Sequence, residues 1–154
     1  MIQFKNIIVP TDFSPHAEHA LGYAKELAKS TGATLHLIHA VEPMVYPVDW
    51  GYAQVGFIDV EKEFIKAAEH DRSALANAIE AEGISVVTAI LHGKASDQIA
   101  AYSQDNSADI ICIATHGRGG LEHFLFGSTT ERVLRKAVCP VFVVKTAIEK
   151  QGGK

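Results

Sequence analysis

The segment DIICIATHGRGGLEHFLFGSTTERVLRKAVCPVFVVK, residues Asp109–Lys145, holds two apolar runs separated by a glycine-bearing loop and a helical pattern. The runs Asp109–Thr115 and Pro140–Lys145 are short and rich in β-branched residues, which is typical of strands buried in a parallel sheet. The residues from Ser128 to Ala137 predict a helix. Strand, helix and strand in this order predict a parallel unit with a right-handed crossover.

The rest of the chain repeats this alternation. Further apolar runs predict strands over Lys5–Pro10, Thr34–Val41 and Ser85–Leu91. Apolar side chains spaced three and four residues apart predict helices over Ser14–Ser30, Ile58–Glu82 and residues 95–106. The sequence therefore predicts an α/β fold: a five-stranded parallel open sheet with helices on both faces, in three α/β/α layers.

Local signals mark the ends of the first helix and the buried face of the second. Ser14 offers an N-cap hydroxyl, Pro15 suits the first helical position, and Gly32 suits the stop.

The connection Glu42–Phe57 is long and aromatic, which fits a flap over the core, a lid over a ligand or a subunit contact. On the second helix one face gathers the apolar residues Phe64, Ile65, Ala68, Leu75, Ala78 and Ile79.

Length and composition limit the classes of protein. The 154 residues predict one domain over residues 1–146 and a polar tail over residues 147–154. A net charge of −4 argues against nucleic acid as a partner. No apolar run approaches the ~20 residues of a membrane span, so no membrane partner is expected. Cys112 and Cys139 are interpreted as reduced core residues, which predicts a cytoplasmic protein.

Two predicted strands end next to polar or glycine residues. Thr11 and Asp12 follow the first strand, and His116 and Gly117 follow the fourth. If these strands are neighbours, their carboxyl ends form one crevice, which is where open α/β sheets bind ligands. The helix that begins at about Ser128 then points its free N–H groups toward the crevice, and this arrangement favours an anion.

Plain helix capping is an alternative explanation of the same residues. Ser128 and Glu131 have the spacing of a capping box, with Gly127 as a turn residue. A turn alone does not require the further glycines at positions 117, 119 and 120, and glycines let backbone N–H groups approach phosphate closely. Arg118 in this loop is either a phosphate contact or a solvated cation.

The glycine loop matches neither a P-loop nor a dinucleotide fingerprint. Its order, G-x2-G-x9-G-[ST], resembles the ATP-binding loop of the universal stress protein family. Here it reads Ala114-Thr115-His116-Gly117, nine residues, then Gly127-Ser128. The stretches IIVPTDFSPHAEHAL, LHLIHAVEP and CPVFVVK resemble the same family, so the resemblance covers almost the whole chain. It implies a Rossmann-like fold of the adenine nucleotide α-hydrolase type.

The resemblance also implies a ligand and its site. ATP would bind in the crevice, accompanied by Mg²⁺ or Mn²⁺. Asp12 would lie near the ribose or adenine, the backbone of Ala40 would meet adenine, and Gly127, Ser128 and Thr129 would hold phosphate oxygens. The full implied nucleotide site comprises Pro10, Thr11, Asp12, Ala40, Ala114, Thr115, His116, Gly117, Arg118, Gly127, Ser128, Thr129 and Thr130.

Two further expectations follow from the resemblance. Members of the family form homodimers, commonly through the last strand, and here Pro140–Lys145 is an apolar edge that would be a liability if left unpaired. The motif's first glycine is replaced by Ala114, whose methyl group is expected to narrow the pocket where the strand ends.

The eight histidines do not form a metal-binding motif. HExxH and CxxC are absent, and His36 and His39 have opposite parity on one predicted strand, so they face opposite sides. The sequence therefore predicts no metal site made by the protein alone. Asp12 is either a ligand of a nucleotide-bound Mg²⁺ or a helix-entry cap.

Together these features predict an ATP-binding stress protein that acts as a nucleotide-dependent signalling module, whose bound state a protein partner reads. No pair of loop residues is placed to activate water against a γ-phosphate, so hydrolysis is expected to be slow or absent. Two alternatives stay open. One is a stress protein of the same fold that binds no nucleotide and acts through protein contacts, and the other is a weak ATP hydrolase.

Overall fold

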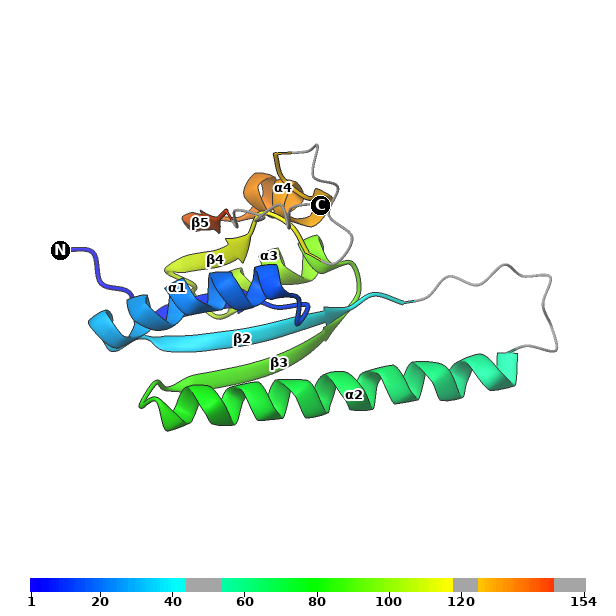
Figure 1. Ribbon diagram of the computed structural model, residues 1–154. Coiled ribbons are helices and arrows are strands. Elements are labelled where there is room, and N and C mark those ends of the chain that lie inside the picture. Colours follow the sequence, from blue (N-terminus) through cyan, green and yellow to red (C-terminus); the bar gives the residue numbers. More distant parts are fainter. Residues whose placement is uncertain (44–53, 118–124, 146–154) are drawn as a thin grey trace, which may run out of the picture.

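The computed structural model describes residues 1–43, 54–117 and 125–145, with the side chains of residues 54–59 left aside. The described residues form a five-stranded sheet and four helices in strict alternation (Figure 1). The strands are β1 (Asn6–Pro10), β2 (Thr34–Val41), β3 (Val86–His92), β4 (Ile110–Ala114) and β5 (Val141–Val144). The helices are α1 (Pro15–Thr31), α2 (Gln54–Ala81), α3 (Ala95–Asp105) and α4 (Ser128–Lys136).

The sheet is parallel throughout, in the order β3-β2-β1-β4-β5. From β1 the chain builds outward through β2 to β3, then returns to the other side of β1 to form β4 and β5. The connections that leave β1 and β4 therefore diverge, and their carboxyl ends form the topological switch point of the sheet. The predicted neighbourhood of the first and fourth strands is confirmed.

Two apolar clusters fill the spaces on either side of the sheet. Leu37 of β2 packs with Leu21 of α1 and Ile79 of α2 in one cluster. Ile38, the next residue of β2, packs with Ile99 of α3 and Val133 of α4 in the other. Alternate strand residues thus face opposite helix layers, which confirms the three-layer arrangement.

The ends of α1 follow the sequence signals. Ser14 is the N-cap, and its Oγ accepts the Ala17 N–H at 3.2 Å. Pro15 occupies the first helical position, where a missing N–H has no cost. Gly32 ends the helix with φ of 72°, a left-handed conformation that glycine adopts without steric penalty.

Helix α2 departs from the prediction in two ways. It begins at Gln54, four residues before the predicted start at Ile58. Phe64 and Ala78, which were expected on the buried face, are exposed, whereas Ala76 is buried. Figure 1 shows α2 running past the carboxyl end of β3.

Both cysteines are free thiols. Cys112 is fully buried in the cluster beneath α1, and burial raises the pKa of its thiol to about 11. Cys139 is half-buried, and burial also raises its pKa. Neither thiol is therefore activated as a nucleophile. Within the described ranges, no helix has the length and apolar character needed to cross a membrane.

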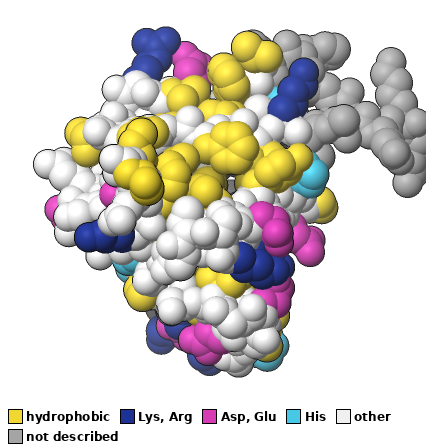
Figure 2. Space-filling model, turned by 90° about the vertical axis from the view of Figure 1, so that its left-hand side faces the viewer, with side chains coloured by type: hydrophobic (Ala, Val, Ile, Leu, Met, Phe, Trp, Pro, Cys, Tyr) yellow, Lys and Arg dark blue, Asp and Glu magenta, His cyan; other side chains and the backbone are white. Residues whose placement is uncertain are grey.

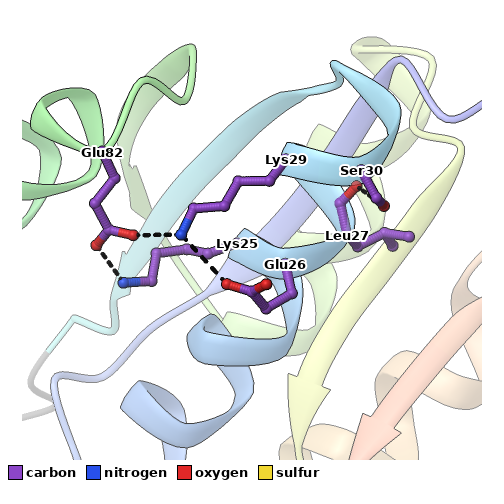
Figure 3. Close-up of polar contacts among 6 residues, drawn as sticks. All are labelled: Lys25, Glu26, Leu27, Lys29, Ser30 and Glu82. Carbon is purple, nitrogen blue, oxygen red and sulfur yellow. Dashed lines mark hydrogen bonds and ion pairs between the residues drawn. The ribbon is translucent and has the colours of Figure 1, made fainter.

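An ion-pair cluster joins the last two turns of α1 to the end of α2. Figure 3 shows Glu82, just beyond α2, reaching both Lys25 and Lys29 of α1. The Nζ–Oε distances are 2.5 Å for Lys25 and 2.9 Å for Lys29. Hydrogen bonds from Lys25 and then Lys29 lower the pKa of Glu82 to about 2.

The stabilisation from Glu82 is expected to disappear in acid. Because the folded pKa lies below the ordinary 4.5, the contribution is present above pH 4.5 and is lost as the pH falls toward 2. Glu82→Gln is therefore expected to be less stable than the wild type at pH 7 and equally stable near pH 2, as measured by urea unfolding. Glu80→Gln is the control, because the exposed Glu80 carboxylate forms no ion pair among the described residues. A stability difference for Glu82→Gln that did not change with pH would contradict this assignment.

Candidate functional site

A cavity of about 530 Å³ opens at the carboxyl ends of β1, β2 and β4. The predicted site residues that line it are Pro10, Thr11, Asp12, Ala40, Ala114, His116, Gly117, Gly127, Ser128, Thr129 and Thr130. Thr115 is buried behind them at 4% exposure. Arg118, the remaining glycines of the loop and the aromatic residues around Trp50 lie outside the described residues. The structure therefore gathers residues from three distant parts of the sequence around one space.

The turn after β1 is held by its own side chains. Asp12 Oδ1 accepts the Ser14 N–H at 3.0 Å, and Thr11 Oγ1 accepts the Phe13 N–H at 3.0 Å. Between these bonds, Phe13 adopts a φ of 59°, which is uncommon for a bulky side chain. Asp12 therefore holds the N-cap residue Ser14 at the entry to α1, and it also lines the cavity.

Gly117 lies directly against Asp12. A β carbon at position 117 would overlap Asp12 Oδ2, so the glycine lets the chain after β4 lie against this carboxylate without a shift of the Asp12 side chain. The His116 ring lies beside this contact, with its Nδ1 3.2 Å from Thr115 Oγ1. The ends of β1 and β4 are thus in contact through a carboxylate and a bare backbone.

Two hydrogen bonds join the start of α4 to the end of β4. The Gly127 N–H donates to the Thr115 carbonyl at 2.7 Å, and Thr130 Oγ1 donates to the Ala114 carbonyl at 2.8 Å. A β carbon at position 127 would lie 3.3 Å from the Thr115 carbonyl oxygen. These bonds occupy the Gly127 amide and the Thr130 hydroxyl, so these two groups serve to place the helix.

The predicted capping box does not form. Gly127 is the N-cap, and Ser128 is already the first helical residue. Glu131 accepts a 2.8 Å bond from Arg135 on the next turn instead of reaching back to the cap. Because Gly127 has no side chain, the first amides of α4, those of Ser128, Thr129 and Thr130, have neither an intrahelical acceptor nor a capping side chain from the N-cap.

The N-terminus of α4 places a partial positive charge beside the cavity. The aligned peptide dipoles place roughly half a positive charge at a helix N-terminus. Ser128 and Thr129, which line the cavity, are at this end of α4. The arrangement suits a phosphate or another oxyanion.

Another part of the cavity wall is apolar and includes residues that the sequence patterns did not indicate. Ala95 and Ile99 of α3 and Ile113 of β4 line it together with Ala40. Ala95 and Ile99 were missed because α3 follows β3 in the chain, and only the crossover from β3 back to β4 brings the first turn of α3 toward β2. Phe126, Ala17 and Glu131 also line the cavity.

His39 is a further residue at the site that was not predicted. Its Nδ1 lies 2.7 Å from the Thr11 carbonyl, and its ring packs on Phe13 at 4.9 Å between centroids. Because a carbonyl only accepts, Nδ1 carries the hydrogen. His36 faces the opposite layer, where its Nδ1 is 3.1 Å from Tyr102 Oη of α3, so the predicted opposite orientation of the two histidines is confirmed.

A smaller cavity of about 340 Å³ adjoins the first on the α2 side of β2. It shares Asp12, His39 and Ala40 with the larger cavity, and Glu42 and Glu61 also line it. In the described part of the chain, no group of three His, Cys, Asp or Glu side chains is arranged to hold a metal ion.

The methyl group of Ala114, where the loop motif has glycine, packs into a small cluster with Ala20 of α1 and Val144 of β5. Ala114 also belongs to the cavity wall, and it is 6% exposed. Its side chain therefore contributes to the packing of β4 between α1 and β5.

The chain is similar to known proteins over nearly its full length. The model of the universal stress protein family matches residues 3–145. The universal stress protein MJ0531 of Methanocaldococcus jannaschii is 32% identical over 145 residues, which cover 92% of this chain and 82% of that protein. The solved structure of MJ0577, another universal stress protein of the same organism, is 27% identical with a TM-score of 0.82, covering 96% of this chain and 100% of that one.

Two more distant structures share the fold and contain nucleotides. One is a universal stress protein in complex with cAMP, 20% identical with a TM-score of 0.68, covering 94% of this chain and 99% of that one. The other is a universal stress protein from Archaeoglobus fulgidus in complex with dAMP. It is 23% identical with a TM-score of 0.66, covering 93% of this chain and 98% of that one. The family match over residues 3–145 and the identity to MJ0531 establish that this chain belongs to the universal stress protein family.

Proposed function

We propose that this protein binds ATP in the larger cavity, with the triphosphate at the start of α4. The observation that carries the proposal is the first turn of α4: it borders the cavity, and its N-cap is a glycine without a capping side chain. Relatives in complex with cAMP and dAMP support an adenine nucleotide as the ligand class.

The lining of the cavity fits the parts of the nucleotide. The phosphates would accept hydrogen bonds from the amides of the first turn and from the Ser128 and Thr129 hydroxyls. The adenine would lie against apolar residues such as Ile99 and Ile113 and meet the backbone of Ala40. Asp12 would then lie between the two ends, near the ribose.

A divalent cation fits this site only together with the nucleotide. Mg²⁺ is usually held by phosphate oxygens and one or two carboxylates. Asp12 is the carboxylate at the switch point of the sheet, and Glu131 is the other acidic residue that lines the cavity. When bound with ATP, the ion would neutralise phosphate charge, and Asp12 is the residue that would hold it.

The proposed role is that of a switch without fast turnover. Binding of ATP would change the loop between Gly117 and Gly127, and a protein partner would read that state. Rapid phosphoryl transfer also needs a residue that orients the attacking water. Hydrolysis is therefore expected to be slow or absent.

A titration of the purified protein with ATP, in the presence and absence of Mg²⁺, tests the binding proposal. Calorimetry is expected to show one ATP site per chain. The absence of heat and of retained nucleotide after equilibrium dialysis would contradict it, and would favour a protein of this fold that acts through protein contacts alone.

We also propose a homodimer through the β5 edge. Phe142 of β5 is 41% exposed, and its ring contacts Tyr23 of α1, which is 50% exposed. Val138, just before β5, is 71% exposed. Figure 2 shows hydrophobic side chains gathered on the upper part of this face, at the height of β5 and α4 in Figure 1. A second copy that paired along β5 would cover this surface and the open strand edge.

Phe142→Lys is expected to convert the dimer to a monomer, because it places a charge in the covered apolar surface. Sedimentation equilibrium measures the change. The control is Val87→Lys on β3, the opposite edge strand, where the side chain is 43% exposed and the dimer is expected to persist. A wild type that sediments as a monomer, or a Phe142→Lys variant that remains dimeric, would contradict the assignment.

A further inference from the structure

The first amide of helix α3 is capped by a side chain from outside the helix. Its N-cap is Lys94, whose side chain makes no capping bond. The N–H of Ala95, the first helical residue, instead donates to Glu42 Oε1 at 2.9 Å. Glu42 is the residue that follows β2. Two residues before Ala95, the Gly93 N–H donates at 3.0 Å to the carbonyl of Val41, the residue before Glu42, so two hydrogen bonds join the start of α3 to the end of β2.

These bonds join two parts of the apolar wall of the larger cavity. Ala95 and Ile99 contribute from α3, and Ala40 contributes from β2, two residues before Glu42. Loss of the Glu42 bond would leave the bond between Gly93 and Val41 in place, but it would loosen the first turn of α3 against β2 and alter the position of Ala95 and Ile99 relative to Ala40. The Glu42 carboxylate is exposed and lines the smaller, neighbouring cavity. It therefore holds the apolar wall in place without lining the larger cavity itself.

The charge of Glu42 also distinguishes two helix ends. The first residues of both α3 and α4 line the larger cavity, and each helix N-terminus attracts anions. At α3 the Glu42 carboxylate already accepts a hydrogen bond from the first amide, whereas the Asp97 carboxylate in the first turn is paired with Lys136 of α4. At α4 the N-cap is a glycine. The first amide of α3 is thus capped by a carboxylate, whereas the first amides of α4 have no capping side chain from the N-cap, so α4 is the better of these two helix ends for a polyphosphate.

We propose that Glu42 is a positioning residue for the nucleotide: its bond to Ala95 holds α3 against β2 in the geometry that receives the purine base. Its charge keeps phosphate away from that end. This inference rests on the proposed binding of ATP in the same cavity. It predicts that the base and the phosphates depend on different residues, Glu42 for the base and the first turn of α4 for the phosphates.

The test compares ATP with inorganic tripolyphosphate, which lacks the base, by calorimetry. Glu42→Ala is expected to weaken ATP binding about fivefold, the size of a lost helix cap. Its affinity for tripolyphosphate should be unchanged or higher. Glu42→Gln keeps an oxygen that accepts the Ala95 N–H and is expected to retain most of the ATP affinity. Glu61→Ala is the matched control, because Glu61 lines the same smaller cavity, and it should bind both ligands as the wild type does.

A second readout needs no ligand. The Ala95 amide is expected to exchange with solvent faster in Glu42→Ala than in the wild type, as measured by NMR. Equal ATP affinity in wild type and Glu42→Ala, or an equal loss of ATP and tripolyphosphate binding, would overturn the positioning role. A loss in Glu42→Gln as large as in Glu42→Ala would overturn the role of the hydrogen bond. Failure of the wild type to bind ATP would instead refute the proposed function, while the Ala95 exchange rate would still report whether the cap exists.

Discussion

Gly127→Val is expected to weaken ATP binding at least 100-fold, about 2.7 kcal/mol. A β carbon at position 127 already lies 3.3 Å from the Thr115 carbonyl oxygen, and the two γ carbons of valine add bulk at the same place. The 2.7 Å bond from the Gly127 N–H to Thr115 then has to lengthen or break. The first turn of α4 moves away from the end of β4, and its amides no longer converge on the phosphates. Calorimetric titration with ATP measures the loss.

Gly22→Ala is the control for this variant. Gly22 lies inside α1, and a β carbon there would meet nothing within 4 Å. Alanine in a helix interior is more favourable than glycine by up to about 1 kcal/mol, so the variant should be at least as stable as the wild type. Its ATP affinity is expected to be unchanged. A folded Gly127→Val protein with wild-type affinity would show that α4 does not hold the phosphates.

Leu37→Ala is expected to lower the free energy of unfolding by about 2–5 kcal/mol. Leu37 lies in the middle of β2, is fully buried, and packs between α1 and α2 in the cluster beneath those helices. Truncation leaves a cavity that the rigid neighbouring strands cannot close. Because small domains have only about 5–15 kcal/mol of stability, this single change removes a large share of it. Urea unfolding followed by circular dichroism measures the difference.

Val87→Ala is the matched truncation on the neighbouring strand. Val87 lies on the edge strand β3 and is 43% exposed, so its removal should cost less than about 1 kcal/mol. An equal loss in the free energy of unfolding for Leu37→Ala and Val87→Ala would contradict the placement of the core on both faces of β1 and β2.

The architecture could be predicted because its signals are local. Each strand is a short apolar run, and the cap of α1 needs only Ser14, Pro15 and Gly32 within its own turns. The parallel order followed from the alternation of strands and helices, and the crossover rule left few other topologies. The structure places the strand and helix ends within a few residues of those expectations.

The departures arise where one sequence pattern satisfies two local structures. Ser128 and Glu131 have capping-box spacing, but the contact of Gly127 with Thr115 makes the glycine the N-cap and moves Ser128 into the helix. Phe64 keeps the helical period of α2, yet it is 64% exposed and lines the smaller cavity with Asp12 and His39. The spacing of apolar residues predicts a helix, but it does not predict how far that helix extends relative to the strands beside it.

The lining of the larger cavity was predictable in part for the same reason. Asp12 and Gly117 each stand at the end of an apolar run, so the meeting of their strands was sufficient to place them together. The bonds from His39 Nδ1 to the Thr11 carbonyl and from the Ala95 N–H to the Glu42 carboxylate join residues far apart in the sequence. No local spacing signals such contacts, because they depend on the exact fit of loops between the layers.

A crystal structure of the protein with ATP and Mg²⁺ tests the central claim most directly. The account predicts phosphate oxygens within hydrogen-bond distance of the Ser128, Thr129 and Thr130 amides, with adenine between Ala40 and the first turn of α3. Nucleotide bound with its phosphates away from α4, or the same recess filled by the protein's own side chains at saturating ATP, would contradict it.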